Sequence, residues 1–152
     1  MLEIREDDLT SEATRALLAL HLGEARSNTP KGFSFALDLS GLRQPNITVW
    51  TAWENDQVAG VCALKHFGDG LGEVKSMRTD PRHLRKGVAS ALLDHIVEEA
   101  RRRGFKRLSL ETGTVAAYEP ALALYRKHGF QEGEAFADYQ PSAYNQFLHL
   151  AL

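Results

Sequence analysis

The sequence predicts an α/β fold in which a mixed β-sheet of about six to seven strands is flanked by about four helices. Three observations predict it. β-rich segments alternate along the chain with segments whose apolar residues fall at helical spacing. Three of the β-rich segments follow one another directly, as in an antiparallel meander. A long amphipathic segment then leads to a further β-rich segment, so we expect a helix that crosses over to a parallel neighbour.

The composition fits one globular domain over residues 1–152, because a chain of this length buries about 70% of its unfolded surface. The formal net charge of -2 provides no general attraction for nucleic acid. Cys62 is the only cysteine, which excludes an internal disulfide and a cysteine-built zinc site. A reducing cytoplasm is therefore the expected location. The acidic N-terminus lacks a signal-like apolar core, and no apolar run approaches the roughly 18 residues of a membrane span.

The N-terminal third is expected to contain one strand, one helix and a covering loop. Residues 1–5 alternate as a strand, and residues 11–25 place apolar side chains on one helical face. Gly23 is expected to close or loosen that helix. Residues 28–45 are rich in turn residues, so we expect a short helix within a loop.

The central part reads as a meander followed by the clearest helix of the chain. Residues 47–53 and 57–67 are β-rich and flank a polar turn, which predicts a hairpin. Residues 71–79 form the third expected strand. Apolar side chains then recur at 3.6 spacing over residues 87–103, and Gly104 is expected to stop that helix.

The C-terminal part supplies the remaining elements. Residues 106–112 are expected to form the strand parallel to 71–79. Pro120 suits the first turn of a helix that reaches His128, and Gly129 ends it. Residues 139–150 alternate loosely and should supply one or two last strands.

The stretch "DPRHLRKGVASALL", residues 80–93, places basic and imidazole side chains directly ahead of the apolar helix. The first turn of a helix carries partial positive charge and usually attracts acidic residues. Positive side chains at such an end are disfavoured unless an outside anion completes the arrangement. The sequence therefore predicts a phosphate site, and Arg82 and His83 are expected to be its more exposed residues.

Two segments, "GEVKSMRTDPRHLRKGVASALL" and "ALALYRKHGF", resemble the GCN5-related N-acetyltransferase (GNAT) superfamily, and the resemblance covers essentially the whole chain. That family's pyrophosphate loop reads Gln/Arg-x-x-Gly-x-Gly/Ala. Gly87 and Ala89 match it, whereas Leu84 replaces the usual Gln or Arg. The resemblance implies the GNAT fold, with a splayed parallel strand pair, and acetyl-coenzyme A as the cosubstrate.

The donor site expected from this resemblance has two parts. Gly87 lets the backbone approach a pyrophosphate, and the N–H groups from Arg85 to Ser90 can point at its oxygens. The resemblance also implies that backbone groups of the strand hold the pantetheine arm. The expected cofactor-binding residues are Met77, Arg78, Thr79, Arg85, Lys86, Gly87, Val88, Ala89 and Ser90.

Four further residues are candidates for the chemistry. By resemblance Glu73 stands where some members carry a general base, although Glu73 could instead pair with Lys75, and Glu111 is the second candidate. Period-two alternation places Glu73, Lys75 and Met77 on one face of the strand, so Lys75 meets either Glu73 or an anionic group of the acceptor. Tyr125 matches the tyrosine that many members place beside the sulfur, and it is the expected general acid.

The function expected from these residues is acetyl transfer from acetyl-coenzyme A to a primary amine of a small molecule, directly and within a ternary complex. A protein N-terminus is an alternative acceptor. A non-catalytic acyl-coenzyme A sensor is an alternative of another class. We expect no metal, nucleic acid or membrane partner, and a homodimer is the assembly considered.

Overall fold

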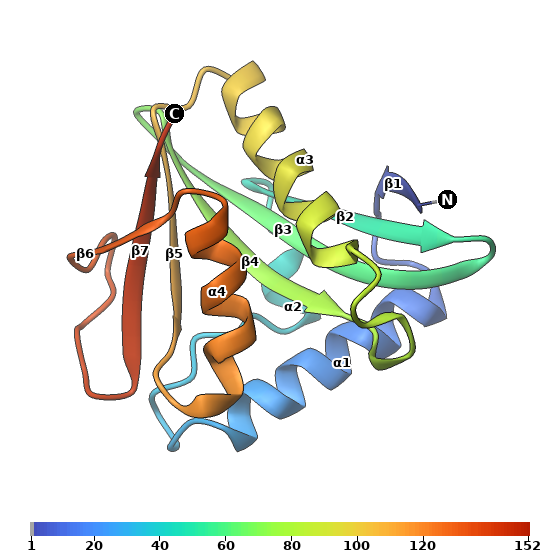
Figure 1. The fold of residues 1–152 in the computed structure, drawn as a ribbon, viewed down its shortest axis with the longest axis horizontal. Helices are drawn as coiled ribbons and strands as arrows, with labels where there is room; N and C mark the ends of the chain where they lie inside the picture. The colour runs from blue at the N-terminus through green and yellow to red at the C-terminus, as the bar shows by residue number, and fades with distance from the viewer. Residues whose placement is uncertain (1) are drawn as a thin grey trace.

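The structure is a computed structural model that describes residues 2–152. The strands are Leu2–Glu6 (β1), Ile47–Glu54 (β2), Gln57–Gly68 (β3), Leu71–Thr79 (β4), Arg107–Gly113 (β5), Gln131–Gly133 (β6) and Asn145–Ala151 (β7). They form one sheet in the order β1-β2-β3-β4-β5-β7-β6 (Figure 1). Neighbouring strands are antiparallel except β4 and β5, which are parallel. This mixed sheet confirms the predicted fold class.

Helices cover both faces of the sheet. They are Glu12–Ser27 (α1), Leu39–Leu42 (α2), Val88–Arg102 (α3) and Glu119–Lys127 (α4). Figure 1 shows α3 and α4 on one face, with α1 and α2 on the other. The apolar stripe of α3 buries Leu92, Leu93 and Ile96 against the sheet, while α1 buries Leu17 and Leu18 in a second cluster. Alternate residues of β2 and β3 supply the sheet side of each cluster.

The parallel strands β4 and β5 separate partway along their length. Their register pairs run from Leu71 opposite Arg107 to Glu73 opposite Ser109. Beyond this point β4 continues to Thr79 and β5 to Gly113. The backbone edges that face each other there are not joined by ladder hydrogen bonds, so the splay expected for this pair is confirmed and begins at Glu73.

A β-bulge in β4 changes which side chains share a face. Val61 pairs with Arg78 and Ala63 pairs with Lys75, so one residue of β3 faces both Ser76 and Met77. Ser76 adopts a φ of 55°, in the left-handed region. The alternation predicted through this strand is therefore wrong beyond Lys75. Lys75 and Arg78 lie on the α1 face, whereas Met77 packs against the cluster under α3.

The ends of several elements differ from those predicted from the sequence, whereas the end of α3 agrees. Gly23 does not end α1, which continues to Ser27, because Gly23 avoids the left-handed conformation that would close the helix. The strand β6 was not predicted, since its three residues are all exposed and show no apolar alternation. The expected strand over 139–150 begins only at Asn145, and the preceding residues form a loop. Gly104, with a φ of 80°, follows α3 as predicted.

Candidate active site

A cavity of about 730 Å³ opens where β4 and β5 part. Its walls come from α1, the loop between α1 and α2, β4, the start of α3, the end of β5, and α4. Most predicted site residues line it: Glu73, Lys75, Met77, Arg78, Thr79, Arg85, Val88, Ala89, Glu111 and Tyr125. Lys86, Gly87 and Ser90 belong to the same loop and helix start but are not part of the lining.

The start of α3 forms one end of this cavity. Gly87 is the N-cap residue with a φ of 79°, and no side chain caps the helix there. The first turn contains no acidic residue, and a Cβ added at Gly87 would meet no atom within 4 Å. Uncapped N–H groups with open space before them form an anion-binding arrangement. The residues present therefore fit the predicted pyrophosphate site.

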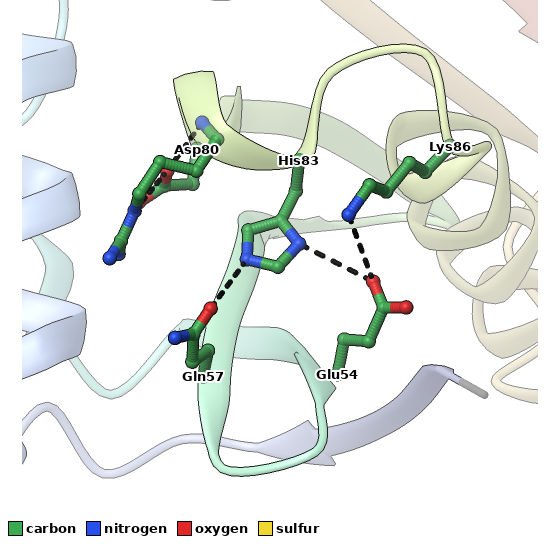
Figure 2. Close-up of polar contacts among 6 residues, drawn as sticks. Glu54, Gln57, Asp80, His83 and Lys86 are labelled. Atoms are coloured by element: carbon green, nitrogen blue, oxygen red, sulfur yellow. Dashed lines mark hydrogen bonds and ion pairs between the residues drawn. The ribbon is translucent and has the colours of Figure 1, made fainter.

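His83 anchors the loop that leads to this helix. Its Nδ1 lies 3.3 Å from Glu54 Oε2 and its Nε2 lies 3.2 Å from Gln57 Oε1, so the ring bridges the β2–β3 hairpin, as Figure 2 shows. Lys86 Nζ lies 3.9 Å from the same Glu54 oxygen. The prediction that His83 is exposed is wrong, since the residue is only 5% exposed. Asp80 starts the turn by accepting a hydrogen bond from the Arg82 backbone N–H at 2.8 Å (Figure 2).

Three polar side chains, two of them buried and that of Tyr139 half-buried, meet where the strands separate. Lys75 Nζ donates to Glu73 Oε2 at 3.1 Å and to the Tyr139 hydroxyl at 2.7 Å. Tyr139 in turn donates to Glu73 Oε2 at 2.5 Å. Burial and the neighbouring Glu73 carboxylate raise the pKa of Tyr139, so the phenol keeps its proton. The other carboxylate oxygen, Glu73 Oε1, is buried without a hydrogen-bond partner among residues 2–152.

Glu111 lies on β5 across the splay from these residues. Burial raises its pKa from 4.5 to about 7, and the Glu73 charge adds to this while Lys75 opposes it. A carboxyl group with that pKa exchanges its proton near neutral pH. Glu111 can therefore accept and release a proton near pH 7, whereas Glu73 forms an ion pair with Lys75.

Arg78 and His21 form a separate polar group on the α1 side of the cavity. Arg78 Nε donates to His21 Nδ1 at 3.2 Å, and its guanidinium pairs with Glu24. Burial, with the charges of Arg78 and Lys75, lowers the pKa of His21 to about 4. His21 is therefore neutral at pH 7, and the Arg78 side chain is held by α1.

Tyr125 lies on α4 with its ring packed edge-on to Phe130, at a centroid distance of 5.9 Å. The residue is 7% exposed and lines the cavity. Burial raises the pKa of Tyr125, so its hydroxyl stays protonated at neutral pH and can donate a hydrogen bond.

Tyr139 is the member of this site that sequence reasoning missed. Tyr139 comes from the loop between β6 and β7. It lies 66 residues after Glu73 and 64 residues after Lys75 in the sequence. No spacing rule connects positions so far apart. The available signal was the pair Phe136 and Tyr139, aromatic residues in a segment that otherwise reads as a polar loop.

Among residues 2–152, no helix is both long enough and apolar enough to cross a membrane. Over the same residues, no group of three or more His, Cys, Asp or Glu side chains is arranged to hold a metal ion.

Comparisons with known proteins identify a family and several similar structures. The model of the acetyltransferase (GNAT) family matches residues 10–130. The chain is 48% identical over 152 residues to the uncharacterized N-acetyltransferase YedL of Escherichia coli (strain K12), covering 100% of this chain and 96% of that protein. A Klebsiella pneumoniae protein assigned as an acyl-CoA N-acyltransferase has a TM-score of 0.84 at 29% identity, with 100% and 98% of the chains covered. A Bacillus subtilis acetyltransferase in complex with CoA shares the fold, with a TM-score of 0.75 at 20% identity over 100% and 99% of the chains.

Proposed function

Because the chain belongs to the GNAT family of acetyltransferases, we propose that it moves the acetyl group of acetyl-coenzyme A to a primary amine of a small molecule. The resemblance inferred from the two sequence motifs is thereby confirmed, and the protein is an acyltransferase. One observation carries the finer proposal. A single cavity extends from the uncapped start of α3 to Tyr125 and to the carboxylates of Glu73 and Glu111.

The donor would bind along the start of α3 and the free edge of β4. The N–H groups after Gly87 would hold the pyrophosphate, with Val88, Ala89 and Ser90 in the same turn. Arg85 lines the cavity and the Lys86 side chain is half exposed, so both can pair with phosphate oxygens. Beyond the splay, backbone groups of Met77, Arg78 and Thr79 would be available to the pantetheine amides and the thioester carbonyl.

The acceptor amine needs to lose a proton before it attacks. An amine with a pKa near 10 is only about 10⁻³ neutral at pH 7. Glu111, with a pKa of about 7, would accept that proton. The free oxygen Glu73 Oε1 would accept a hydrogen bond from the same nitrogen and orient it. This assignment makes Glu111 the base and Glu73 the residue that positions the amine.

The transfer exchanges a C–S bond for a C–N bond and moves one proton from nitrogen to sulfur. The nitrogen lone pair attacks the thioester carbon, a C–N bond forms, and the C–S electron pair leaves with sulfur, which takes up the proton that the new amide nitrogen releases. Tyr125 would donate a hydrogen bond to the departing thiolate, and its raised pKa suits a donor that keeps its proton. With both substrates held in one cavity, no covalent enzyme intermediate is required.

Two measurements on the purified protein test this function. Mass spectrometry should detect an N-acetylated amine and one equivalent of free coenzyme A. Initial rates at several fixed amine concentrations should give intersecting double-reciprocal lines, as expected for a ternary complex. Parallel lines would indicate an acetylated enzyme and contradict direct transfer. Release of coenzyme A at the same rate with and without every amine tested would contradict acetyl transfer to an amine.

A further inference from the structure

Aromatic side chains from two loops form the wall of the cavity near Glu73. Phe33, from the loop between α1 and α2, and Tyr144, from the loop between β6 and β7, pack with ring centroids 4.9 Å apart. Both line the cavity, yet they remain 38% and 41% exposed. Phe35 continues this wall and packs edge-on against Tyr139, which donates to Glu73. Large rings left exposed at a cavity wall are suited to cover an apolar ligand.

The polar groups beside this wall favour a cation and disfavour an anion. Glu73 Oε1 is buried, faces no partner among the described residues, and belongs to a side chain that lines the cavity. Such an oxygen is stabilised when it accepts a hydrogen bond from a donor such as an ammonium group. Glu111 adds a second carboxyl group across the splay.

The basic side chains of this part of the cavity are already paired. Lys75 is held by Glu73 and Tyr139, and Arg78 is held by Glu24 and His21. His21 is neutral at pH 7, since its pKa is about 4. A carboxylate next to the acceptor amine would therefore meet two carboxyl groups and, among the described residues of this part of the cavity, no free cation.

We infer that the acceptor is a primary amine carried by an otherwise unsubstituted short alkyl chain on an aromatic ring, so that no carboxylate lies beside the amino group. The inference rests on the proposed acetyl transfer in this cavity. The amino group contacts Glu73 Oε1 and Glu111, and the ring packs on Phe33 and Tyr144. The ring provides apolar area to bury, while the absent carboxylate avoids repulsion from Glu73 and Glu111.

A small amine panel tests the substrate class with the wild-type protein. It contains 2-phenylethylamine, phenylalanine, propylamine and the dipeptide phenylalanyl-glycine amide, and kcat/KM is measured from coenzyme A release. We expect 2-phenylethylamine to exceed phenylalanine and propylamine each by about tenfold or more. Equal or better use of phenylalanine or propylamine overturns the inference. Preference for the dipeptide amide would assign the site to peptide N-termini and overturn it as well.

Variants of the aromatic wall test its role. Phe33→Ala and Tyr144→Ala should each lower kcat/KM for 2-phenylethylamine by about tenfold and leave that for propylamine within about twofold. Phe67→Ala is the matched control, because Phe67 is 37% exposed but does not line the cavity. Equal losses on both amines in both wall variants overturn the inference. Acetylation of amines without a ring preference refutes only the substrate class, whereas absence of acetylation of every amine refutes the proposed function too.

Discussion

Lys75 and Glu73 form a buried ion pair, with 3.1 Å between Nζ and Oε2 and side-chain exposures of 8% and 2%. Sequence reasoning left open whether Lys75 meets Glu73 or an anionic acceptor. In the structure Lys75 Nζ contacts Glu73 and Tyr139, so its positive charge is paired within the protein. Removing one member of such a pair leaves an uncompensated buried charge.

Lys75→Met is therefore expected to lower the free energy of unfolding by about 3–5 kcal/mol, because Glu73 stays buried without its cation. Chemical denaturation measures this. The double variant Glu73→Gln with Lys75→Met should recover most of the loss, since neither charge remains. If the double variant is as unstable as the single one, Lys75 stabilises the protein by packing and not by pairing.

Glu111→Gln is expected to change how the rate depends on pH. In the wild type, log kcat/KM should rise up to about pH 7, where Glu111 loses its proton, and stay level until the amine itself titrates near pH 10. The variant requires the free amine from solution, so its kcat/KM should keep rising to about pH 10. The deficit at pH 7 should be about 10²-fold or more. A variant whose profile levels off at pH 7 like the wild type would exclude Glu111 as the base.

The raised pKa of Glu111 also predicts how the free energy of unfolding changes with pH. Burial raises the pKa of Glu111 from 4.5 to about 7, so its contribution to folding is fully present below about pH 4.5 and is lost as the pH rises through 7. Glu111→Gln removes this dependence. Denaturation of both proteins at pH 5 and pH 8 should show a smaller decrease for the variant, and equal decreases would indicate that Glu111 titrates normally.

Tyr125→Phe is expected to lower kcat by about 10²-fold and to change KM for acetyl-coenzyme A by less than about twofold. The variant loses the hydroxyl that we propose acts on the leaving sulfur, and it keeps the ring that packs on Phe130. Tyr118→Phe is the control, because it removes a hydroxyl from the same cavity. Unchanged turnover in Tyr125→Phe would reduce Tyr125 to a packing residue.

His83→Ala is expected to raise KM for acetyl-coenzyme A by about tenfold with little change in kcat, because the ring holds the loop before α3, where we propose the phosphates bind, on the β2–β3 hairpin. S-acetylpantetheine, which lacks the pyrophosphate, should be used equally well by variant and wild type. Arg102→Ala is the control, since Arg102 lies at the other end of α3 and its side chain is 74% exposed. Equal losses on both thioesters would point to a general structural defect.

The features of the fold and of the candidate site that could be predicted from the sequence are those that depend on residues close together in the chain. The apolar stripe of α3, the glycine at its start and the missing acidic cap lie within one short stretch, and the structure has all three. Helix electrostatics makes a phosphate site there a prediction. The order of strands and helices also predicted a parallel pair after a meander, and the sheet confirms it.

The parts that could not be predicted depend on tertiary contacts. The positive φ of Ser76 is held by pairing with β3, and serine does not signal such a bulge. His83 reads as a polar residue of a basic turn, but Glu54 and Gln57 of a distant hairpin bury it. The pKa of Glu111 depends on burial and on Glu73, and neither is visible in the order of residues.

The central claim is that the start of α3 binds the pyrophosphate of acetyl-coenzyme A. Calorimetric titration of Gly87→Glu with coenzyme A tests it most directly, because the variant adds a carboxylate at an open position before the helix. Gly68→Glu is the matched control, since Gly68 also has a positive φ, of 87°, and open space around its Cβ position but lies outside the cavity. We expect Gly87→Glu to lose detectable binding while remaining folded, and Gly68→Glu to bind like the wild type. Wild-type affinity in a folded Gly87→Glu protein would contradict the claim.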